Sequence, residues 1–315
     1  MVTDLEMIQS RVQRLGNEHA IHVASGMEGH VFRDGEQRVA KAWFHKSPDE
    51  IVALKSYYWS LHTLSLPFAT PEILSIDFVD GTTVSIECEL SGRSMGELVC
   101  EQDETARYFA VEALTAILRG LGTDEVPHPG SNLPILDIRP SEEAFQRGPS
   151  HVPCEVASKK VAQFGSQLRV SVPGFDLLFA RTIEHLLALT VARTCAIHGD
   201  LVSPNILLDD RGCVTAVLDW GLLSMFGDPA FDASITAGIF NMYGPHGREI
   251  DENLLTHFQR ELGYSKERML LYRALYAIMS SNFYSPNGTD GHYAWCVATL
   301  KREDIRSVLS STRIE

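Results

Sequence analysis

The chain has 315 residues, of which 44% are hydrophobic, and its formal net charge at pH 7 is −14. This length exceeds that of one typical domain, and the apolar content can supply two hydrophobic cores. The acidic balance argues against nucleic acid as a partner, because phosphate contacts need a basic surface, whereas a cationic substrate is compatible with it.

Neither a targeting segment nor a membrane span is predicted. Residues 1–16 carry charges from the start and lack the apolar segment of a signal peptide. The longest apolar stretches, such as LLFARTIEHLLAL at 177–189, are interrupted by charges within a few residues. The six cysteines show no C-x-x-C spacing and are too sparse for a disulfide framework. These features predict a reduced, cytoplasmic protein that does not bind a membrane.

The N-terminal half begins with a β-rich pattern at 23–43, VASGMEGHVFRDGEQRVAKAW. We predict three strands here, joined by a turn that contains Gly26 and Gly29 and by a second turn at 34–35, with Lys41 on the third strand. The two glycines do not complete a G-x-G-x-x-G loop, and an ordinary hairpin turn explains them equally well. The chain has no G-x-x-x-x-G-K-[ST] sequence, which disfavours a P-loop nucleotide-binding protein.

Two further elements follow in this half. The segment SPDEIVALKSYYWSLHTL predicts a helix with Ser47 as its N-cap, Pro48 at its first position and Glu50 three residues after the cap. A capping box of this kind explains Glu50 without any catalytic role. A strand is predicted at 82–89, and it runs into a glycine turn at 91–92.

The rest of the chain is predicted to be mainly helical. Apolar residues spaced by three and four predict a helix at 104–121 and another at 177–189. The segment 122–170 between them is longer than a plain connection, and we expect short helical pieces in it. Further helices are expected near 231–242, 252–262, 266–282 and 292–311.

The stretch AIHGDLVSPNILLDDRGCVTAVLDWG at 196–221 combines two aspartates with a hairpin pattern. Apolar runs on either side of the turn-forming DDRG predict two antiparallel strands. Because the two ends of a hairpin lie together, Asn205 before the first strand and Asp219 after the second should be neighbours, and Asp200 lies in the loop that leads there. An amide oxygen and a carboxylate suit Mg²⁺, and the second carboxylate could then accept a proton from a hydroxyl.

The order of these parts is that of a kinase catalytic and metal site: His-x-Asp, an asparagine five residues later, a hairpin, and a strand that ends in aspartate. Any one of the polar residues alone is more simply a turn former or a cap. Together, HGDLxxxNxL at 198–207, VLDW at 217–220 and GDPAFDAS at 227–234 closely resemble the aminoglycoside phosphotransferase and choline kinase branch of the protein-kinase-like fold.

This resemblance implies an α+β fold of two lobes. Residues 1–90 would form an ATP-binding lobe around a small antiparallel β-sheet, with a hinge near 87–92. Residues 93–315 would form a larger, mainly helical lobe for catalysis and acceptor binding. The reaction implied is phosphoryl transfer from ATP to a hydroxyl of a small molecule.

In the first lobe, the resemblance assigns Lys41 and the glycine turn at 26–29 to the ATP phosphates. Glu50 is the nearest candidate partner of Lys41, although it falls earlier relative to the next strand than the family pattern suggests. Backbone groups of the linking strand, which carries Glu87 and Glu89, would contact adenine.

In the second lobe, Asn205 and Asp219 would bind Mg²⁺, and Asp200 would accept the proton of the acceptor hydroxyl. His198 is expected to brace the loop by hydrogen bonds and to point away from Asp200. Asp232 is expected to cap or brace rather than to catalyse.

Several acceptors remain open. The first hypothesis for the acceptor is an aminoglycoside or related antibiotic, because VTAVLDWGLLSMFGD is similar to hygromycin-type and other aminoglycoside or macrolide phosphotransferases. A metabolic kinase of choline, homoserine, methylthioribose or a sugar shares the same core and is the alternative. A nucleotide-binding pseudokinase is a third hypothesis, kept open by the sparse glycine turn. The preference for ATP over GTP and the oligomeric state do not follow from the sequence.

Candidate acceptor residues come from 122–170 and 242–295. One set consists of acidic residues that could bind amino groups of the acceptor: Glu249, Asp251, Glu252 and Asp290. A solvated helix face explains these residues more simply. A second set keeps helical spacing and is interpreted as core first and as an acceptor-pocket wall second: Met269, Tyr272, Tyr276, Met279 and Phe283.

Overall fold

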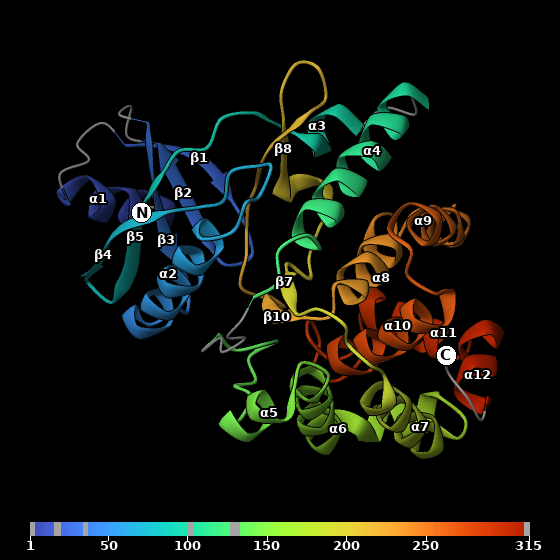
Figure 1. Cartoon of the computed structure of the whole chain (residues 1–315). Coiled ribbons are helices and arrows are strands. Elements are labelled where there is room, and N and C mark those ends of the chain that lie inside the picture. The colour runs from blue at the N-terminus through green and yellow to red at the C-terminus, as the bar shows by residue number, and fades with distance from the viewer. Residues whose placement is uncertain (1–3, 16–19, 34–36, 100–103, 127–132, 312–315) are drawn as a thin grey trace. The chain divides into compact units, whose positions relative to one another are not determined.

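The computed structural model consists of two compact units, each with its own architecture. The described residues are 4–15, 20–33, 37–99, 104–126 and 133–311. Among them, those within 1–93 and 207–218 form the N-terminal unit, and those within 94–206 and 219–315 form the C-terminal unit. One unit carries an antiparallel β-sheet and the other is mostly helical, so the predicted α+β fold class is confirmed (Figure 1).

The N-terminal unit is built on a five-stranded antiparallel sheet with the strand order β1-β2-β3-β5-β4. Its elements are α1 (Asp4–Arg14), β1 (Ile21–Ser25), β2 (Gly29–Arg33), β3 (Arg38–Trp43), α2 (Pro48–His62), β4 (Ile73–Val79) and β5 (Thr82–Cys88). The strands and the helix predicted from the sequence are therefore present. The turn predicted at 34–35 lies outside the described residues.

One face of this sheet carries the hydrophobic core of the unit. The core residues come from the sheet, from α1 and from the segment between them: Val12, Ala20, Phe32, Ala40, Ala42, Val84 and Ile86. Because side chains alternate along a strand, Lys41 points to the opposite face, where Val31 and Ser85 are its partners in register. The sheet thus directs Lys41 away from the core that α1 covers.

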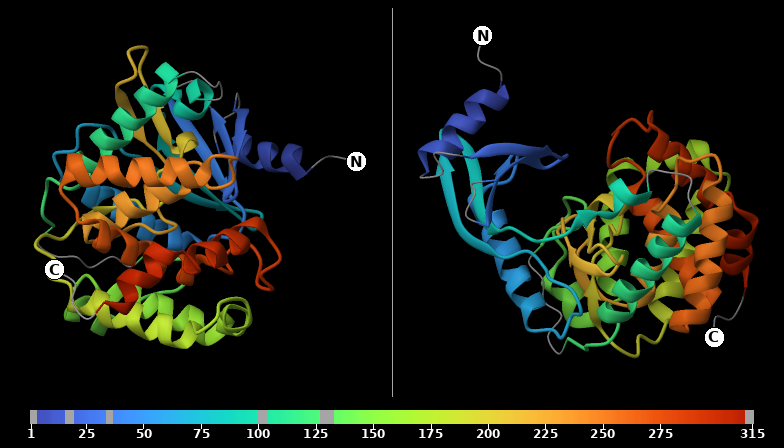
Figure 2. Two further views of the ribbon diagram at one scale, coloured as in Figure 1. Left: turned by 90° about the vertical axis from the view of Figure 1, so that its right-hand side faces the viewer. Right: turned by 90° about the horizontal axis from the view of Figure 1, so that it is seen from above.

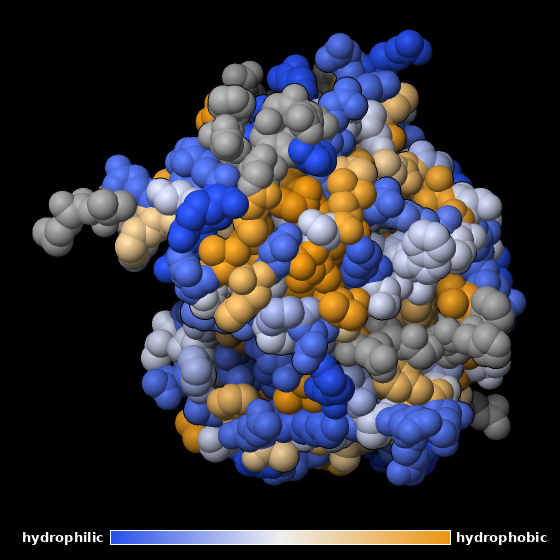
Figure 3. All heavy atoms as spheres, turned by 90° about the vertical axis from the view of Figure 1, so that its left-hand side faces the viewer, coloured by the Kyte–Doolittle hydropathy of each residue, from blue (hydrophilic) through white to orange (hydrophobic). Residues whose placement is uncertain are grey.

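Some apolar side chains of this unit lie outside the core. Trp59 of α2 is 71% exposed and Phe78 of β4 is 62% exposed. The space-filling view of one face shows hydrophobic side chains gathered near its centre and bordered by hydrophilic ones (Figure 3). Apolar atoms make up much of any protein surface, so these residues alone do not identify a site.

The predicted hairpin forms within 206–218. Its strands are β8 (Ile206–Leu208) and β9 (Val214–Val217), which are neighbours in one short sheet. The Asp209 carboxylate accepts two backbone N–H bonds across the turn, each 2.9 Å long, as expected for a turn-forming aspartate. Two backbone hydrogen bonds between Ala69 and β9, of 2.9 and 3.0 Å, attach the hairpin to the N-terminal unit.

The C-terminal unit is mainly helical and also contains an antiparallel pair of strands, β7 (Cys195–Ile197) and β10 (Met225–Gly227). The helices, preceded by the short strand β6 (Arg93–Ser94), are α3 (Met95–Val99), α4 (Glu104–Leu121), α5 (Glu142–Arg147), α6 (His151–Ser171), α7 (Phe175–Ala188), α8 (Pro229–Ile239), α9 (Gly247–Leu262), α10 (Lys266–Ser280), α11 (Gly291–Leu300) and α12 (Glu303–Ser310). Within the described ranges, no helix combines the length and the apolar character that a membrane span needs.

Helix α10 is the centre of this unit (Figure 2). Every residue from 269 to 280 is buried, as expected for a helix that is packed on all sides. The core interpretation of the spaced aromatic and methionine residues is therefore confirmed for Met269, Tyr272, Tyr276 and Met279, whereas Phe283 lies beyond the helix and is half-buried.

Two helical predictions for this unit were wrong in extent. The segment 122–170, in which short pieces were expected, contains most of the 21-residue helix α6. Its buried face includes Lys160 and Gly165, which obscure the hydrophobic period. The single helix expected at 292–311 is two helices, because the chain breaks at Arg302, whose guanidinium binds the Asp251 and Asp304 carboxylates at 2.6 and 2.7 Å.

A buried arginine on α10 yields a prediction about stability. The fully buried Arg273 donates to Asp251 at 2.7 Å and to the Ser234 carbonyl. The variant Arg273→Met leaves the buried Asp251 carboxylate without this partner, so the free energy of unfolding should fall by about 3–5 kcal/mol. Denaturant unfolding measures this change, and Arg260→Met, at an exposed arginine, should change it by less than about 0.5 kcal/mol. Equal losses in both variants would contradict the structural role of Arg273.

Candidate active site

The loop at residues 198–205, here called the Asp200 loop, brings Asp200 and Asn205 together. Asn205 ends a single turn of 3₁₀ helix and is buried. Its Nδ2 atom donates to the Asp200 carbonyl oxygen at 3.0 Å and lies 3.5 Å from the Asp200 carboxylate. The Asn205 amide oxygen, the atom that a metal ion would use, takes part in neither contact.

Asp219 follows β9 in a strained conformation. Its φ angle is +56°, in the left-handed region that residues other than glycine seldom adopt. Such a conformation costs of order 1–3 kcal/mol and persists only where the surrounding structure holds it, often at functional sites. Aspartate and asparagine tolerate this region better than most residues, because their short polar side chains can bond locally.

The residues next to Asp219 tie it to the Asp200 loop. The ring centroids of Trp220 and His198 are 4.5 Å apart, and Trp220 is almost fully buried. A second link runs through Ser224, whose hydroxyl accepts the Gly221 N–H at 2.8 Å and donates to the His198 carbonyl at 3.1 Å. The structure therefore brings the segment of Asp219 against the loop that carries Asp200 and Asn205.

Asp232 of α8 holds the start of the Asp200 loop. Its two carboxylate oxygens accept the backbone N–H groups of His198 and Gly199, each at 2.7 Å. His198 in turn accepts the Asp200 N–H at its Nδ1 atom, at 3.1 Å. Both residues thus brace the loop as expected, although His198 bends back toward Asp200 instead of pointing away.

The conformation of the Asp200 loop requires glycine at position 199. Its φ angle is +80°, and a Cβ atom added there would lie 2.3 Å from the Cβ of Leu223. A side chain would therefore both strain the backbone and displace Leu223. This steric reason explains glycine between the histidine and the aspartate of the HGD sequence.

The burial of Asp232 predicts a pH-dependent stability. Burial raises the pKa of the Asp232 carboxyl to about 6; its two hydrogen bonds oppose this rise and the charge of Asp200 adds to it. Since the folded pKa exceeds the usual value of 3.8, the folded protein binds a proton between pH 4 and 6 that the unfolded chain releases. The contribution of Asp232 to the free energy of unfolding should therefore fall by up to roughly 3 kcal/mol as the pH rises from 4 to 6.

Denaturant unfolding of the wild type and of Asp232→Asn at several pH values measures this effect. The difference between the two curves should change between pH 4 and 6 and be constant above that range, because asparagine does not titrate. A constant difference throughout would show that Asp232 stays ionised in the folded protein.

In the N-terminal unit, Lys41 lies beside the glycine turn. Its Nζ atom is 3.4 Å from the Glu28 carboxylate and 4.0 Å from the centroid of the Trp43 ring. Glu28 also binds Lys46 at 2.8 Å. Glu28 was not among the residues predicted from the sequence, and the signal available was an acidic residue in the glycine turn that precedes β2.

The two glycines of this turn differ in their surroundings. A Cβ atom at Gly29 would lie 2.2 Å from the Ala42 carbonyl oxygen, so close packing against β3 explains this glycine. A Cβ atom at Gly26 would meet nothing within 4 Å. The Gly26 N–H donates to the Gly29 carbonyl at 2.9 Å and closes the turn. Phosphate binding by either glycine stays a prediction.

Glu50 forms the capping box that its sequence context indicates. Its carboxylate accepts the Ser47 N–H at 2.9 Å and the Ser47 hydroxyl at 2.8 Å, while the Ser47 hydroxyl accepts the Glu50 N–H. These contacts fix the start of α2. The pairing of Glu50 with Lys41 stays a prediction.

Glu87 lies near the end of β5 and Glu89 follows this strand, and both side chains make polar contacts. The buried Glu87 carboxylate accepts the Ser85 hydroxyl at 2.6 Å, and the Glu89 carboxylate binds Arg33 at 2.5 Å. The Glu89 N–H donates to the Gln37 carbonyl at 2.8 Å. Any adenine contact of Glu89 would therefore use its carbonyl oxygen.

The four acidic acceptor candidates are not equivalent. Asp251 is buried between two arginines, which hold the pKa of its carboxyl below the usual value against the opposing effect of burial. Glu249 lies 3.6 Å from His246, and Glu252 binds Arg248. Asp290 differs, because its Oδ2 atom is buried without a hydrogen-bond partner. Ion pairs with arginine thus account for Asp251 and Glu252, whereas Glu249, which is 72% exposed, fits a solvated helix face.

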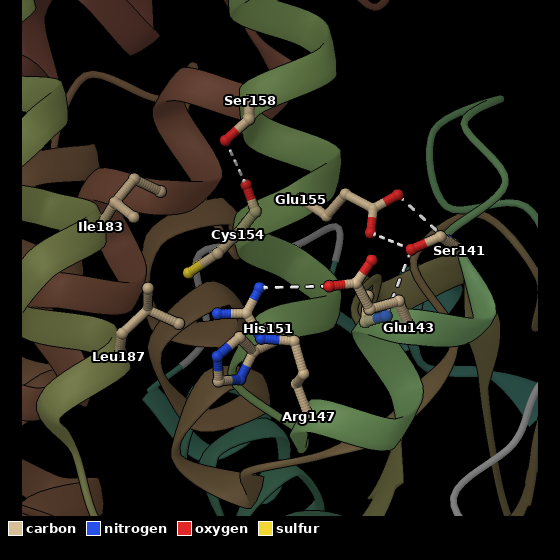
Figure 4. Close-up of a pocket in the computed structure, with 10 residues that line it drawn as sticks. Ser141, Glu143, Arg147, His151, Cys154, Glu155, Ser158, Ile183 and Leu187 are labelled. Atoms are coloured by element: carbon tan, nitrogen blue, oxygen red, sulfur yellow. Dashed lines mark hydrogen bonds and ion pairs between the residues drawn. The ribbon is translucent and has the colours of Figure 1, made fainter.

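A separate pocket of about 230 Å³ lies among α5, α6 and α7 (Figure 4). Its charged groups face one another: Arg147 lies 3.6 Å from Glu143, and Ser141 donates to Glu155 at 2.5 Å. Burial raises the pKa of the Cys154 thiol to about 12, which makes this cysteine a poor nucleophile. None of the predicted site residues lines this pocket.

Comparison with known proteins identifies the family. A family model described as the phosphotransferase enzyme family matches residues 90–272, more than half of the chain, and its span includes Asp200, Asn205 and Asp219. The chain belongs to this family. The family and enzyme class predicted from the sequence are therefore confirmed: this phosphotransferase is a small-molecule kinase. No curated protein matches the sequence.

Solved structures of antibiotic phosphotransferases share the fold. Aminoglycoside phosphotransferase APH(3'')-Id from Streptomyces rimosus, in complex with ADP and streptomycin, is 19% identical, with a TM-score of 0.58 over 91% of this chain and 100% of that chain. The gentamicin complex of APH(2")-IIa is 14% identical, with a TM-score of 0.59 over 96% and 98%. Macrolide 2'-phosphotransferase type I is 18% identical, with a TM-score of 0.55 over 95% and 98%. At these identities the similarity establishes the fold.

Proposed function

We propose that this phosphotransferase moves the γ-phosphoryl group of ATP to a hydroxyl of an aminoglycoside or related antibiotic and acts as a resistance kinase. The main observation behind the proposal is the structure of the Asp200 loop. Asn205 donates a hydrogen bond to the Asp200 carbonyl, and Asp232 holds the start of the loop. Structures of the same fold that contain ADP with streptomycin, or gentamicin, support the nucleotide and the acceptor class.

In the proposed reaction, the Asp200 carboxylate orients the acceptor hydroxyl and accepts its proton. The hydroxyl oxygen forms a bond to the γ-phosphorus, and the bond to the β,γ-bridging oxygen breaks. The products are the phosphate ester of the acceptor and ADP. Bracing by Asp232 keeps the base in place, because its bonds to two successive N–H groups fix the backbone just before Asp200.

Asn205 and Asp219 would hold Mg²⁺ through an amide and a carboxylate oxygen, a donor set that fits this ion when phosphates and water complete it. A bound Mg²⁺ would offset the negative charge that develops on the phosphoryl group. The strained backbone of Asp219 supports this assignment, because such strain is retained where a function requires it.

Residues of the N-terminal unit would bind the nucleotide. The Lys41 ammonium would contact the phosphates, with Glu28 holding it beside the glycine turn. Backbone groups near Glu87 and Glu89 would contact adenine. We further expect a cytoplasmic location on the sequence grounds given above.

The test is ADP release from Mg·ATP across a panel of aminoglycosides, macrolides and metabolic alcohols. Turnover with antibiotics supports the resistance hypothesis. Turnover with metabolic alcohols alone would replace it with the metabolic alternative. ATP binding without turnover on any acceptor would favour a pseudokinase.

One observation favours the metabolic alternative as a second candidate. Aminoglycosides carry several ammonium groups, yet two of the four acidic acceptor candidates, Glu252 and Asp251, are engaged in ion pairs with arginines of the C-terminal unit. An acceptor with fewer charges requires fewer carboxylates.

A further inference from the structure

Two histidines of the β1–β2 hairpin meet at one hydroxyl group. His22 of β1 places its Nε2 atom 2.9 Å from the Ser25 hydroxyl oxygen, and His30 of β2 places its Nδ1 atom 2.8 Å from the same oxygen. The ring centroids of the two histidines are 5.6 Å apart, and the ring planes are inclined at 74°. Two imidazole nitrogens from different strands are therefore directed at a single point.

Neighbouring aromatic side chains hold the two rings in place. Both rings lie beside the buried Phe32, at centroid distances of 5.5 Å for His22 and 6.4 Å for His30. The His30 ring also packs edge to face against Phe44, with centroids 4.8 Å apart. The histidines are half-buried, whereas Ser25 is exposed. The point at which the two nitrogens meet is thus positioned by packing and can be reached from solvent.

The histidine pair lies on the face of the sheet opposite to Lys41. His22 is the partner in register of Phe32, and His30 is the partner of Ala42. Phe32 and Ala42 belong to the core, and partners in register point to the same side of a sheet, so both histidines lie on the core side. Lys41 points to the other side. The pair is therefore separate from the residues proposed to bind the nucleotide.

The strand that carries His22 makes few stabilising contacts. In the described part of the chain, β1 lies at the edge of the sheet and pairs with β2 alone. The pairing is irregular between residues 22 and 24, and four of the five residues of β1 are exposed. Strands with little burial open more readily than core strands. A cross-link between β1 and β2 would therefore have a measurable stabilising effect.

The donor set suits a borderline divalent cation. Imidazole nitrogens bind Zn²⁺ and Cu²⁺ well, whereas Mg²⁺ prefers oxygen ligands. Zn–N bonds are about 2.0–2.1 Å long, so an ion fits where the Ser25 hydroxyl now lies once this exposed side chain rotates away. The described residues include no group of three or more histidine, cysteine, aspartate or glutamate side chains that could hold a metal ion. The site would therefore have two histidine ligands, with water at its remaining positions.

We propose that His22 Nε2 and His30 Nδ1 bind one Zn²⁺ ion, which takes the place of the Ser25 hydroxyl at their meeting point and cross-links β1 to β2. Each neutral imidazole gives the ion one lone pair and keeps its proton on the other ring nitrogen, so nothing is oxidised or reduced. The inference is independent of the proposed function, because it involves neither nucleotide nor acceptor.

The first test measures Zn²⁺ binding to the full chain without nucleotide. Zinc chloride is titrated calorimetrically in the presence of excess Mg²⁺, which competes for oxygen ligands. His22→Gln and His30→Gln should each weaken the binding by at least about tenfold, since losing a residue that only supports a ligand already costs about 10- to 100-fold. Ser25→Ala should bind at least as tightly as the wild type, because no hydroxyl then competes for the nitrogens.

The matched control is His246→Gln, which removes an exposed histidine of the C-terminal unit that lies 3.6 Å from Glu249. This variant should have the zinc affinity of the wild type. Equal affinities in the wild type, His22→Gln and His30→Gln would overturn the inference. An equally large loss of affinity in Ser25→Ala would also overturn it, because the hydroxyl would then be the required group.

A second test uses the wild-type chain and does not depend on the folding of a variant. Diethylpyrocarbonate acylates neutral imidazoles, and mass spectrometry of peptides locates the label. Zn²⁺ should protect His22 and His30, because one nitrogen of each ring binds the metal and the other carries the proton. His246 should stay labelled, and hydrogen exchange of the β1 amides should slow when Zn²⁺ is added. Labelling of His22 and His30 that zinc does not change would refute the site.

Discussion

Replacing Asp200 with asparagine should lower kcat by about 10²- to 10⁴-fold, the usual contribution of general-base assistance. Asparagine keeps the shape of the side chain but cannot accept the hydroxyl proton. The bond from Asn205 to the Asp200 carbonyl involves the backbone, so the loop should keep its conformation. Initial rates of ADP release at saturating ATP and acceptor measure the effect.

Asp209→Asn is the matched control, because Asp209 lies in the same stretch of sequence but only closes the hairpin turn. Its kcat should stay within about twofold of the wild type, since the substitution removes no group that acts on substrate. If Asp200→Asn kept wild-type turnover, the assignment of Asp200 as the base would be wrong.

Replacing Asp219 with asparagine should reduce kcat/KM by about 10²- to 10³-fold, because the proposed Mg²⁺ site would lose a charged oxygen. Asparagine adopts a left-handed φ angle about as readily as aspartate, so the backbone at +56° need not rearrange. Alanine would add backbone strain to the loss of the ligand and is the less informative variant.

A magnesium titration of ADP release distinguishes Asp219 from Asp200. The concentration of Mg²⁺ at half-maximal rate should rise in Asp219→Asn and stay near the wild-type value in Asp200→Asn. An unchanged magnesium dependence in Asp219→Asn would remove this residue from the metal site.

Local patterns in the sequence were enough to predict the parts of the fold that local physics determines. The hairpin at 206–218 follows from turn-forming residues between apolar runs, and the bounds of α4 follow from apolar spacing. The hairpin also predicts that Asn205 and Asp219 lie at its open end, and the structure shows Asn205 hydrogen-bonded to Asp200.

Features that depend on tertiary contacts could not be predicted in this way. The left-handed φ angle of Asp219 depends on how the chain leaves β9. A bracing role was expected for Asp232, but its partners, the backbone N–H groups of His198 and Gly199, lie more than thirty positions earlier and could not be identified. The pairing of Asp251 with Arg273 could not be predicted either. The sequence pattern of α9 does not distinguish an aspartate in water from one that contacts a buried arginine.

Aromatic residues illustrate both cases. Helical spacing correctly predicted that Tyr276 lies in the core. Tyr243 and Tyr284 lie in loops, where no period indicates which way a side chain points.

The central claim is that the chain transfers a phosphoryl group from ATP to a hydroxyl, and γ-phosphate-labelled ATP tests it most directly. After incubation with an acceptor and Mg²⁺, mass spectrometry of the acceptor is compared with the amount of ADP formed, for the wild type and for Asp200→Asn. We expect one labelled phosphoryl group on the acceptor for each ADP, and almost none in the variant. Labelled inorganic phosphate with an unmodified acceptor, or equal labelling by the variant, would contradict the account.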